Sequence, residues 1–229
     1  MKLSPATVIA GMLLVGLTAC VPTTPTPAPT TSSGTTPTPT ATSSASPSDP
    51  EEVEVTAAVV VMTASALSVF GTDGSTLASV NYEMDGAAAV AQIAGALDEE
   101  PVVTPVPGDV DSPCPPATSY EFGGLELRSP GSLGSVGAFE AIVTGTTTTA
   151  GVGIETIAAQ QIGASRATFE AAVGEVMPLY EPPHPQVGID VLNPEAGVYD
   201  RIGVYANFTG GTLDFLAAPH LLGFIGSCA

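Results

Sequence analysis

From residue 51 onward, short apolar runs alternate with polar residues and turn residues, and this pattern predicts a folded domain rich in strands. Val53 and Val55 alternate with Glu52, Glu54 and Thr56, which is typical of a half-buried strand. Asp73-Gly74 and Gly123-Gly124 each separate two extended runs and predict tight hairpins. The runs expected to be extended are 53–56, 67–70, 77–82, 102–103, 120–122, 125–128, 139–149, 152–157, 187–191, 204–208 and 213–216.

Two segments have the spacing of short helices. In the first, Asp85 is the expected N-cap, and Ala89, Val90, Ile93, Ala94 and Leu97 follow helical periodicity. The acids 98–100 oppose the macrodipole, so the helix is expected to end before them. Ser165 is the expected N-cap of a second helix, whose apolar face carries Phe169, Ala172 and Val173.

These elements predict an α+β fold, in which an antiparallel sheet carries short helices. The order of strand pair, short helix and Gly-Gly hairpin occurs twice, because Gly210-Gly211 repeats the role of Gly123-Gly124. The candidate halves are 51–130 and 136–229. The match lies in the order and the turn residues rather than residue by residue, so a duplication and its absence stay equally open.

The first 50 residues have a different composition. Lys2, the apolar run 8–17 and the small residues before Cys20 predict a targeting segment over 1–19. The apolar run is shorter than the roughly 20 residues that span a bilayer. Between residues 21 and 50, 24 of 30 positions are Pro, Thr or Ser. Such a segment cannot bury enough apolar surface to offset its ordering entropy, so a disordered stalk is expected over 20–50.

Leu17-Thr18-Ala19-Cys20 resembles the lipobox of bacterial lipoproteins at all four positions. The resemblance implies a signal peptide cleaved after Ala19, a lipid on Cys20 and attachment to the extracytoplasmic face of the cell membrane. The alternative is an ordinary secretory signal that ends near a cysteine. Proline-rich segments favour extended geometry, so the stalk would hold the domain away from the membrane.

Ile162 to Ser165, before the second helix, and the two Gly-Gly hairpins are short motifs that carry a likeness to known proteins. With this order of elements, the domain resembles a class of secreted and lipid-anchored actinobacterial proteins. More distantly, it is similar to the tandem α+β modules of the β-lactamase inhibitor proteins, in which helices pack on an antiparallel sheet. The likeness implies a fold, and no inhibitory residue is transferred from it.

With Cys20 lipidated, Cys114 and Cys228 remain. Disulfides persist in exported proteins, so a single bridge between these two is expected. The alternative is two separate thiols, one buried and one near a loose chain end.

The large negative charge of the chain disfavours some classes of binding partner. Beyond Cys20 the chain has 23 acidic residues, 3 arginines and no lysine, a formal charge of 3 − 23 = −20. Nucleic acid and anionic membrane surfaces both need cationic partners, so neither is expected as a ligand. Solvated acidic surface is the simpler explanation of the charge. Asp109 and Asp111 are weak candidates for a calcium site, since calcium prefers oxygen ligands.

The sequence carries no recognised catalytic motif. Ser135 lies in a stretch like a nucleophile elbow, but Leu133 stands where the first glycine belongs. His184 and His220 each neighbour proline and are expected in surface loops. We therefore expect no catalytic residue and no cofactor, and a lipid-anchored, envelope-exposed binding or interaction module. The alternatives are an exported hydrolase with an unrecognised site and a structural or sensor accessory protein. A concave site joining a histidine to an acid and a nucleophile would favour the enzyme, and an exposed apolar patch would favour the binding module.

Overall fold

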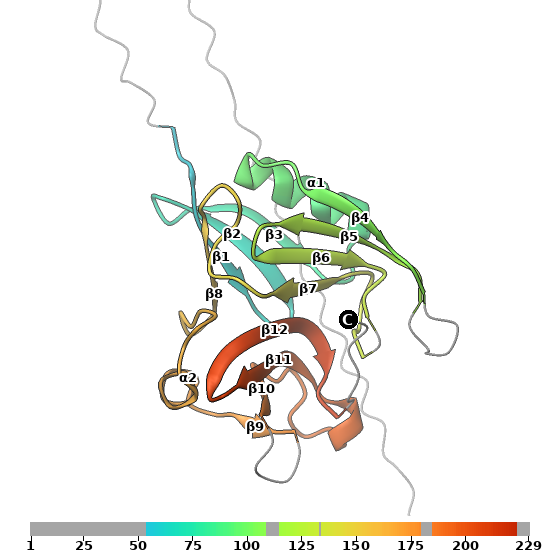
Figure 1. Cartoon of the computed structure of the whole chain (residues 1–229), viewed down its shortest axis with the longest axis vertical. Helices are drawn as coiled ribbons and strands as arrows, with labels where there is room; N and C mark the ends of the chain where they lie inside the picture. The colour runs from blue at the N-terminus through green and yellow to red at the C-terminus, as the bar shows by residue number, and fades with distance from the viewer. Residues whose placement is uncertain (1–53, 109–114, 133, 180–184, 224–229) are drawn as a thin grey trace, which may run out of the picture. The chain divides into compact units, whose positions relative to one another are not determined.

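Two sheets and two short helices form the computed structural model, which describes residues 54–108, 115–132, 134–179 and 185–223 (Figure 1). All of them belong to the unit Glu51–Ala229. The sheets are mostly antiparallel and the helices are short, so the predicted α+β class is confirmed.

The smaller sheet has four strands in the order β3-β2-β1-β8. β2 pairs antiparallel with both β1 and β3, whereas β1 and β8 run parallel. The strands are β1 (Ala57–Met62), β2 (Ala66–Gly71), β3 (Thr76–Asn81) and β8 (Gly153–Thr156). The first and second halves of the chain thus share one sheet.

The larger sheet has eight strands in the order β4-β5-β6-β7-β12-β11-β10-β9, all paired antiparallel. Its strands are β4 (Val102–Val106), β5 (Ala117–Phe122), β6 (Leu125–Ser129), β7 (Glu140–Val143), β9 (Met177–Pro178), β10 (Gln186–Ile189), β11 (Ile202–Thr209) and β12 (Thr212–Leu221). The hairpins β2–β3, β5–β6 and β11–β12 form at the predicted turns. At Gly123, a positive φ of 63° explains why glycine is needed in the second of these hairpins.

Both helices begin at the predicted caps. The Asp85 side chain accepts a hydrogen bond from the Ala88 N–H at 3.1 Å, at the start of α1 (Gly86–Leu97). Asp98 closes that helix in the left-handed conformation, so α1 ends before the acids as predicted. The Ser165 side chain caps α2 (Arg166–Val173) through the Thr168 N–H at 3.2 Å. The 3-10 turn η1 spans Val198–Asp200.

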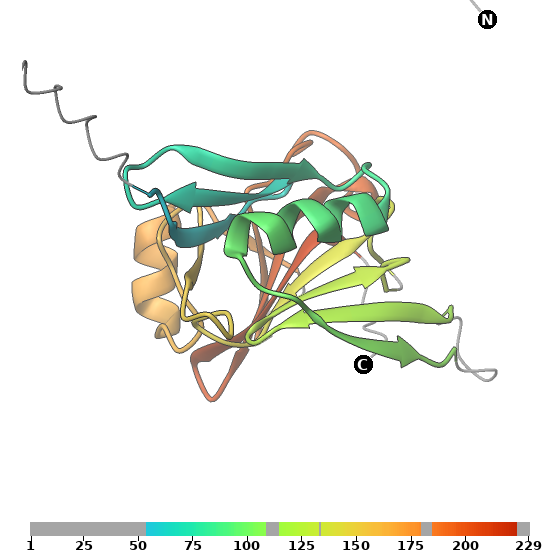
Figure 2. The same ribbon diagram turned by 90° about the horizontal axis from the view of Figure 1, so that it is seen from above.

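Helix α1 packs against both sheets, with contacts to β2 and β3 on one side and to β6 on the other. Figure 2 shows α1 between the β1–β3 strands and the β4–β6 strands. The close approach to β6 depends on Gly86, because a Cβ atom there would collide with the Ser129 side chain. This packing leaves a groove between α1 and the strands β4 and β5.

Three local expectations are wrong. The run expected to be extended over 139–149 is a strand only over β7 (Glu140–Val143). Residues 54–56 are exposed coil, and the first strand is β1, with Val60 and Met62 buried. The apolar run 58–62 has no alternation of apolar and polar residues, so it was not recognised as a strand. The alternating Glu and Val residues before it have the pattern of a half-buried strand and were predicted instead. His220 is also not in a surface loop, because it lies in β12 and only 4% of its surface is exposed.

Candidate functional site

One group of polar side chains is buried where segment 130–138 meets the ends of β3, β7 and β12. We call it the buried polar cluster, and it contains Tyr82, Ser132, Ser135, Glu140 and His220. Backbone hydrogen bonds hold the segment in place: the Ala138 N–H donates to the Tyr82 carbonyl at 2.7 Å, and the Leu221 N–H donates to the Gly134 carbonyl at 2.7 Å.

Glu140 is the most deeply buried acid of the described residues, with 1% of its surface exposed. Its Oε2 accepts a hydrogen bond from the Ser132 N–H at 2.9 Å and another from the Ser132 hydroxyl. Burial raises the pKa of the Glu140 carboxyl, and the two Ser132 hydrogen bonds oppose that shift only in part. The neighbouring Arg128 also lowers this pKa, but its Nε binds Glu126 Oε1 at 2.9 Å.

His220 is held by its own strand and by an aromatic neighbour. Its Nδ1 lies 2.9 Å from the Leu221 carbonyl oxygen, which can only accept, so Nδ1 carries the proton. The imidazole lies 5.0 Å from the Tyr205 ring, centroid to centroid. Burial lowers the pKa of His220, which favours the neutral ring at physiological pH.

Ser135 comes close to His220 in the backbone without forming a catalytic pair. The two residues form an isolated antiparallel bridge. Within the described part of the chain, however, the Ser135 Oγ is buried and has no hydrogen-bond partner. A nucleophilic serine needs a base within hydrogen-bond reach. The cluster thus contains the residue types of a hydrolase, but in this arrangement the base does not contact the nucleophile.

Tyr82 and Asp190 both bind the backbone of the β1–β2 turn, and Asp190, which follows β10, thereby links the large sheet to the small one. The Tyr82 hydroxyl donates to the Thr63 carbonyl at 3.1 Å, and Asp190 Oδ2 accepts from the Ala64 N–H at 2.7 Å. Burial raises the pKa of the Tyr82 phenol far above its usual value, and the charges of Glu140 and Asp190 add to the shift. These contacts have a structural role, because each polar group bonds to backbone of the β1–β2 turn.

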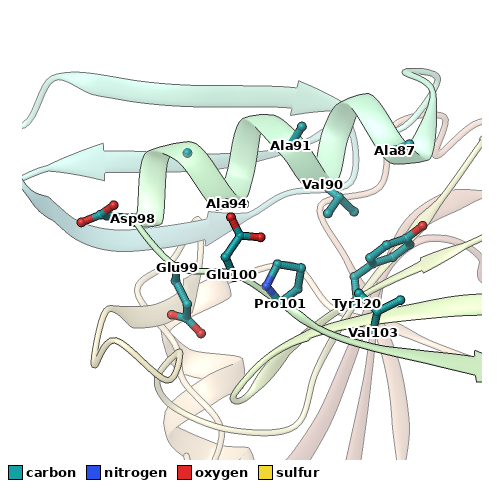
Figure 3. A pocket seen from close by; sticks show the side chains of 11 residues that line it. Ala87, Val90, Ala91, Ala94, Asp98, Glu99, Glu100, Pro101, Val103 and Tyr120 are labelled. Carbon is teal, nitrogen blue, oxygen red and sulfur yellow. The ribbon is translucent and has the colours of Figure 1, made fainter.

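An open groove lies elsewhere, between α1 and the strands β4 and β5, and we call it the α1–β4 groove (Figure 3). Its volume is about 550 Å³. Val90 of α1 and Tyr120 of β5 face one another across it. The complete lining is Ala87, Val90, Ala91, Ala94, Gly95, Asp98, Glu99, Glu100, Pro101, Val103 and Tyr120.

The composition of α1 explains why the groove exists. The helix presents small residues, alanine or glycine, at 87, 91, 94 and 95, so little side-chain volume fills the space above β4. The end of the groove beside the helix C-terminus is acidic, with Asp98, Glu99 and Glu100 (Figure 3). Glu99 Oε2 accepts a hydrogen bond from the Ala150 N–H at 2.9 Å. The groove therefore combines an apolar floor with a negatively charged end.

Strand β4 exposes two large apolar side chains, of which Val103 lines the groove and Val102 does not. Val102 and Val103 are 64% and 57% exposed. Sequence reasoning predicted that they lie in a strand but missed that this strand is the edge of a sheet. Pro105 was the available signal, because proline inside a strand pattern is largely confined to edges.

The predicted site residues are not brought together in the described part of the structure. Cys20, Cys114, Cys228, Asp109, Asp111 and His184 lie outside the described residues. Among those that are described, no group of three or more His, Cys, Asp or Glu side chains is arranged to hold a metal ion. The lining of the α1–β4 groove includes no serine, cysteine or histidine, so its chemistry is limited to carboxylates and one phenol.

No helix in the described segments has the length and apolar character that a membrane crossing requires. Comparison with protein-family models, with curated proteins and with solved structures finds no match for this chain.

Proposed function

We propose that this chain is a lipid-anchored, envelope-exposed interaction module that binds its partner at the α1–β4 groove. The observation that carries the proposal is that the solvent-accessible groove and the residues of catalytic type lie in different places. The accessible α1–β4 groove has an apolar floor that includes the exposed Val103. Among the described residues that resemble a hydrolase site, His220 and the Ser135 Oγ are buried. Apolar surface of this kind, next to polar residues, is typical of interaction sites.

The enzyme alternative has one observation in its favour, the backbone bridge between Ser135 and His220. A hydrolase needs a substrate-accessible nucleophile with an oriented base. The Leu221 carbonyl orients the His220 ring through Nδ1 and leaves Nε2 as the possible base. The Ser135 Oγ, however, is buried and has no hydrogen-bond partner among the described residues, so it is neither accessible nor in contact with that base. The interaction module is therefore the stronger proposal.

The anchoring part of the proposal is supported by the four-residue lipobox ending at Cys20 and by the Pro/Thr/Ser composition that follows it. Two lipid chains or more would give stable attachment to the outer face of the cell membrane, where the Cys114–Cys228 bridge would persist. Replacement Cys20→Ala should leave an uncleaved precursor or release the protein into the medium. Normal detergent-phase partitioning of that variant would refute the anchor.

The repeated order of elements also supports an internal duplication as a proposal about the origin of the fold. Helix α1 is followed by the hairpin β5–β6, and α2 is followed by the hairpin β11–β12, each with a Gly-Gly turn. Both hairpins belong to the same large sheet.

The groove is tested by filling it. Ala91 is exposed and lines the groove, whereas Ala88 is exposed on the same helix but is not among the lining residues. Partners are captured by cross-linking from the cell envelope with the full chain, its Ala91→Tyr variant and its Ala88→Tyr variant. A specific partner should be lost with Ala91→Tyr and kept with Ala88→Tyr. Equal capture by all three proteins would refute the groove as the binding site.

A further inference from the structure

We infer that the α1–β4 groove accepts an extended, cationic segment of another protein, which adds to the large sheet as a strand beside β4. This inference rests on the proposed function and names the chemistry and geometry of its partner. It depends on three features of the described residues: an open strand edge, the alternation of side chains along that strand, and the charge at one end of the groove.

The first feature is the edge. β4 is the first strand of the large sheet, and among the described residues it pairs with β5 alone. Four of its five residues are exposed. An exposed strand edge offers unpaired N–H and C=O groups, and proteins use such edges to bind extended peptides.

The position of Pro105 indicates which backbone groups are offered. Proline has no N–H, so it is tolerated in an edge strand where its nitrogen faces away from the neighbouring strand. Backbone direction repeats every second residue, so the N–H and C=O of Val103 face the open side together with the Pro105 carbonyl. These are the groups that an added strand would bond.

The second feature is the alternation of side chains. Val103 lines the groove opposite α1, and its cross-strand partner Tyr120 lines it too. Val102 then points to the opposite face of the sheet. A strand added beside β4 would therefore direct every second side chain toward the groove, where small residues of α1 leave room for it.

The third feature is the charge. Asp98, Glu99 and Glu100 lie at one end of the groove, and no lysine or arginine is among the lining residues. Charge complementarity favours a segment with lysine or arginine near this end. A second copy is disfavoured because the chain beyond Cys20 carries a formal charge of 3 − 23 = −20. The Pro/Thr/Ser segment 21–50 of the same chain is disfavoured because it contains no basic residue.

The test uses labelled peptides of about eight residues, the length of an ordinary strand. One set alternates lysine or arginine with valine, leucine or tyrosine. The control set has the same apolar residues with glutamate. Fluorescence anisotropy with the full chain measures affinity at low and high salt. Only the cationic set should bind, and the binding should weaken with salt because the acidic end of the groove is open to solvent.

Two variants separate the parts of the inference. Asp98→Asn/Glu100→Gln removes two groove charges with little change of shape, and Glu54→Gln/Glu83→Gln removes two exposed charges outside the groove lining. The first pair should weaken binding about fivefold, and the control pair less than about twofold. Val103→Pro removes an outward N–H and should weaken binding by about tenfold or more. Leu77→Pro on the edge strand β3 of the small sheet is its control, and it should bind peptide normally.

The outcomes distinguish this inference from the proposed function. Loss of binding in both groove variants, with both controls unaffected, supports the added cationic strand. Equal binding of the glutamate peptides, or failure of the whole cationic set to bind, overturns it. So does normal binding by Val103→Pro. In those cases the proposed function still stands if Ala91→Tyr alone loses the envelope partner.

Discussion

An active site combines catalytic side chains with access for a substrate. In this protein the buried polar cluster has side chains of catalytic type, whereas the α1–β4 groove is accessible. The cluster has a histidine, two serines and a carboxyl group, but Glu140 and His220 are almost completely buried. The groove is open, but it offers carboxylates, a phenol and apolar side chains. Residue types that suggest catalysis are therefore informative only together with their accessibility. In this fold Glu140 of β7 holds Ser132 through two hydrogen bonds, and His220 bonds to the carbonyl of the next residue in its own strand. The accessible groove is suited to binding.

The largest difference between the two regions should be in stability. Glu140→Ala removes the acceptor of the Ser132 N–H and hydroxyl, and a buried donor without an acceptor costs about 1–3 kcal/mol. Glu100→Ala changes an exposed acid of the groove and should alter the free energy of unfolding by less than about 0.5 kcal/mol. Urea unfolding of both variants measures the difference. Equal losses of stability in the two variants would contradict the difference expected between the cluster and the groove.

The pH dependence of stability should also come from the buried cluster. The pKa of Glu140 is raised in the folded state, so its contribution is fully present below its unfolded pKa, near 4.5, and is lost as pH rises through the folded pKa. Glu140→Gln removes this titration. The stability of the wild type relative to Glu140→Gln should therefore fall as pH rises through that range. Urea unfolding in a pH series from 3.5 upward, applied to both proteins, provides the measurement, and parallel curves would contradict the prediction.

The contribution of His220 to the free energy of unfolding should change with pH in the opposite direction. Its folded pKa is lowered, so its contribution is present above the unfolded value of about 6.5 and is lost as pH falls through the folded pKa. His220→Gln should lack this loss between neutral and mildly acidic pH. The imidazole proton signals in NMR give the folded pKa directly. A His220 titration at or above 6.5 would show that burial does not dominate.

The groove variants should change binding and not stability. Ala91→Tyr and Asp98→Asn/Glu100→Gln alter exposed residues, so their unfolding free energies should stay within about 0.5 kcal/mol of the wild type. Thermal or urea unfolding provides this control for every binding experiment. A large destabilisation would mean that the groove residues support the packing of α1.

The last prediction is that Ser135 does not react with a probe for activated serines. Its Oγ is buried, and no hydrogen bond to His220 is present among the described residues. A fluorophosphonate probe that labels activated serines should leave Ser135 unmodified, as shown by mass spectrometry of the digested protein. Stoichiometric labelling of the native protein would reverse the comparison and favour the hydrolase.

Local features of the fold were predictable because they depend on neighbouring residues. Asp85 and Ser165 cap their helices, Asp98 ends the first helix, and the glycine pairs turn the predicted hairpins. The first strand was misplaced because the apolar run 58–62 has no alternation. The α1–β4 groove could not be predicted, since it depends on the distance between a helix and strands that only packing sets.

The α+β class, the helix ends and the hairpin turns could be predicted from the sequence, because these depend on interactions within a few residues along the chain. The acidic charge is counted directly from the sequence, whereas the lipid on Cys20 and the bridge between Cys114 and Cys228 stay predictions. Long-range strand pairing and packing made β4 an edge, buried His220 in β12 and brought Glu140 to Ser132. Burial and strand order depend on contacts between residues far apart in the chain. The same histidine or valine can therefore be a surface residue or a core residue, depending on which strands pair.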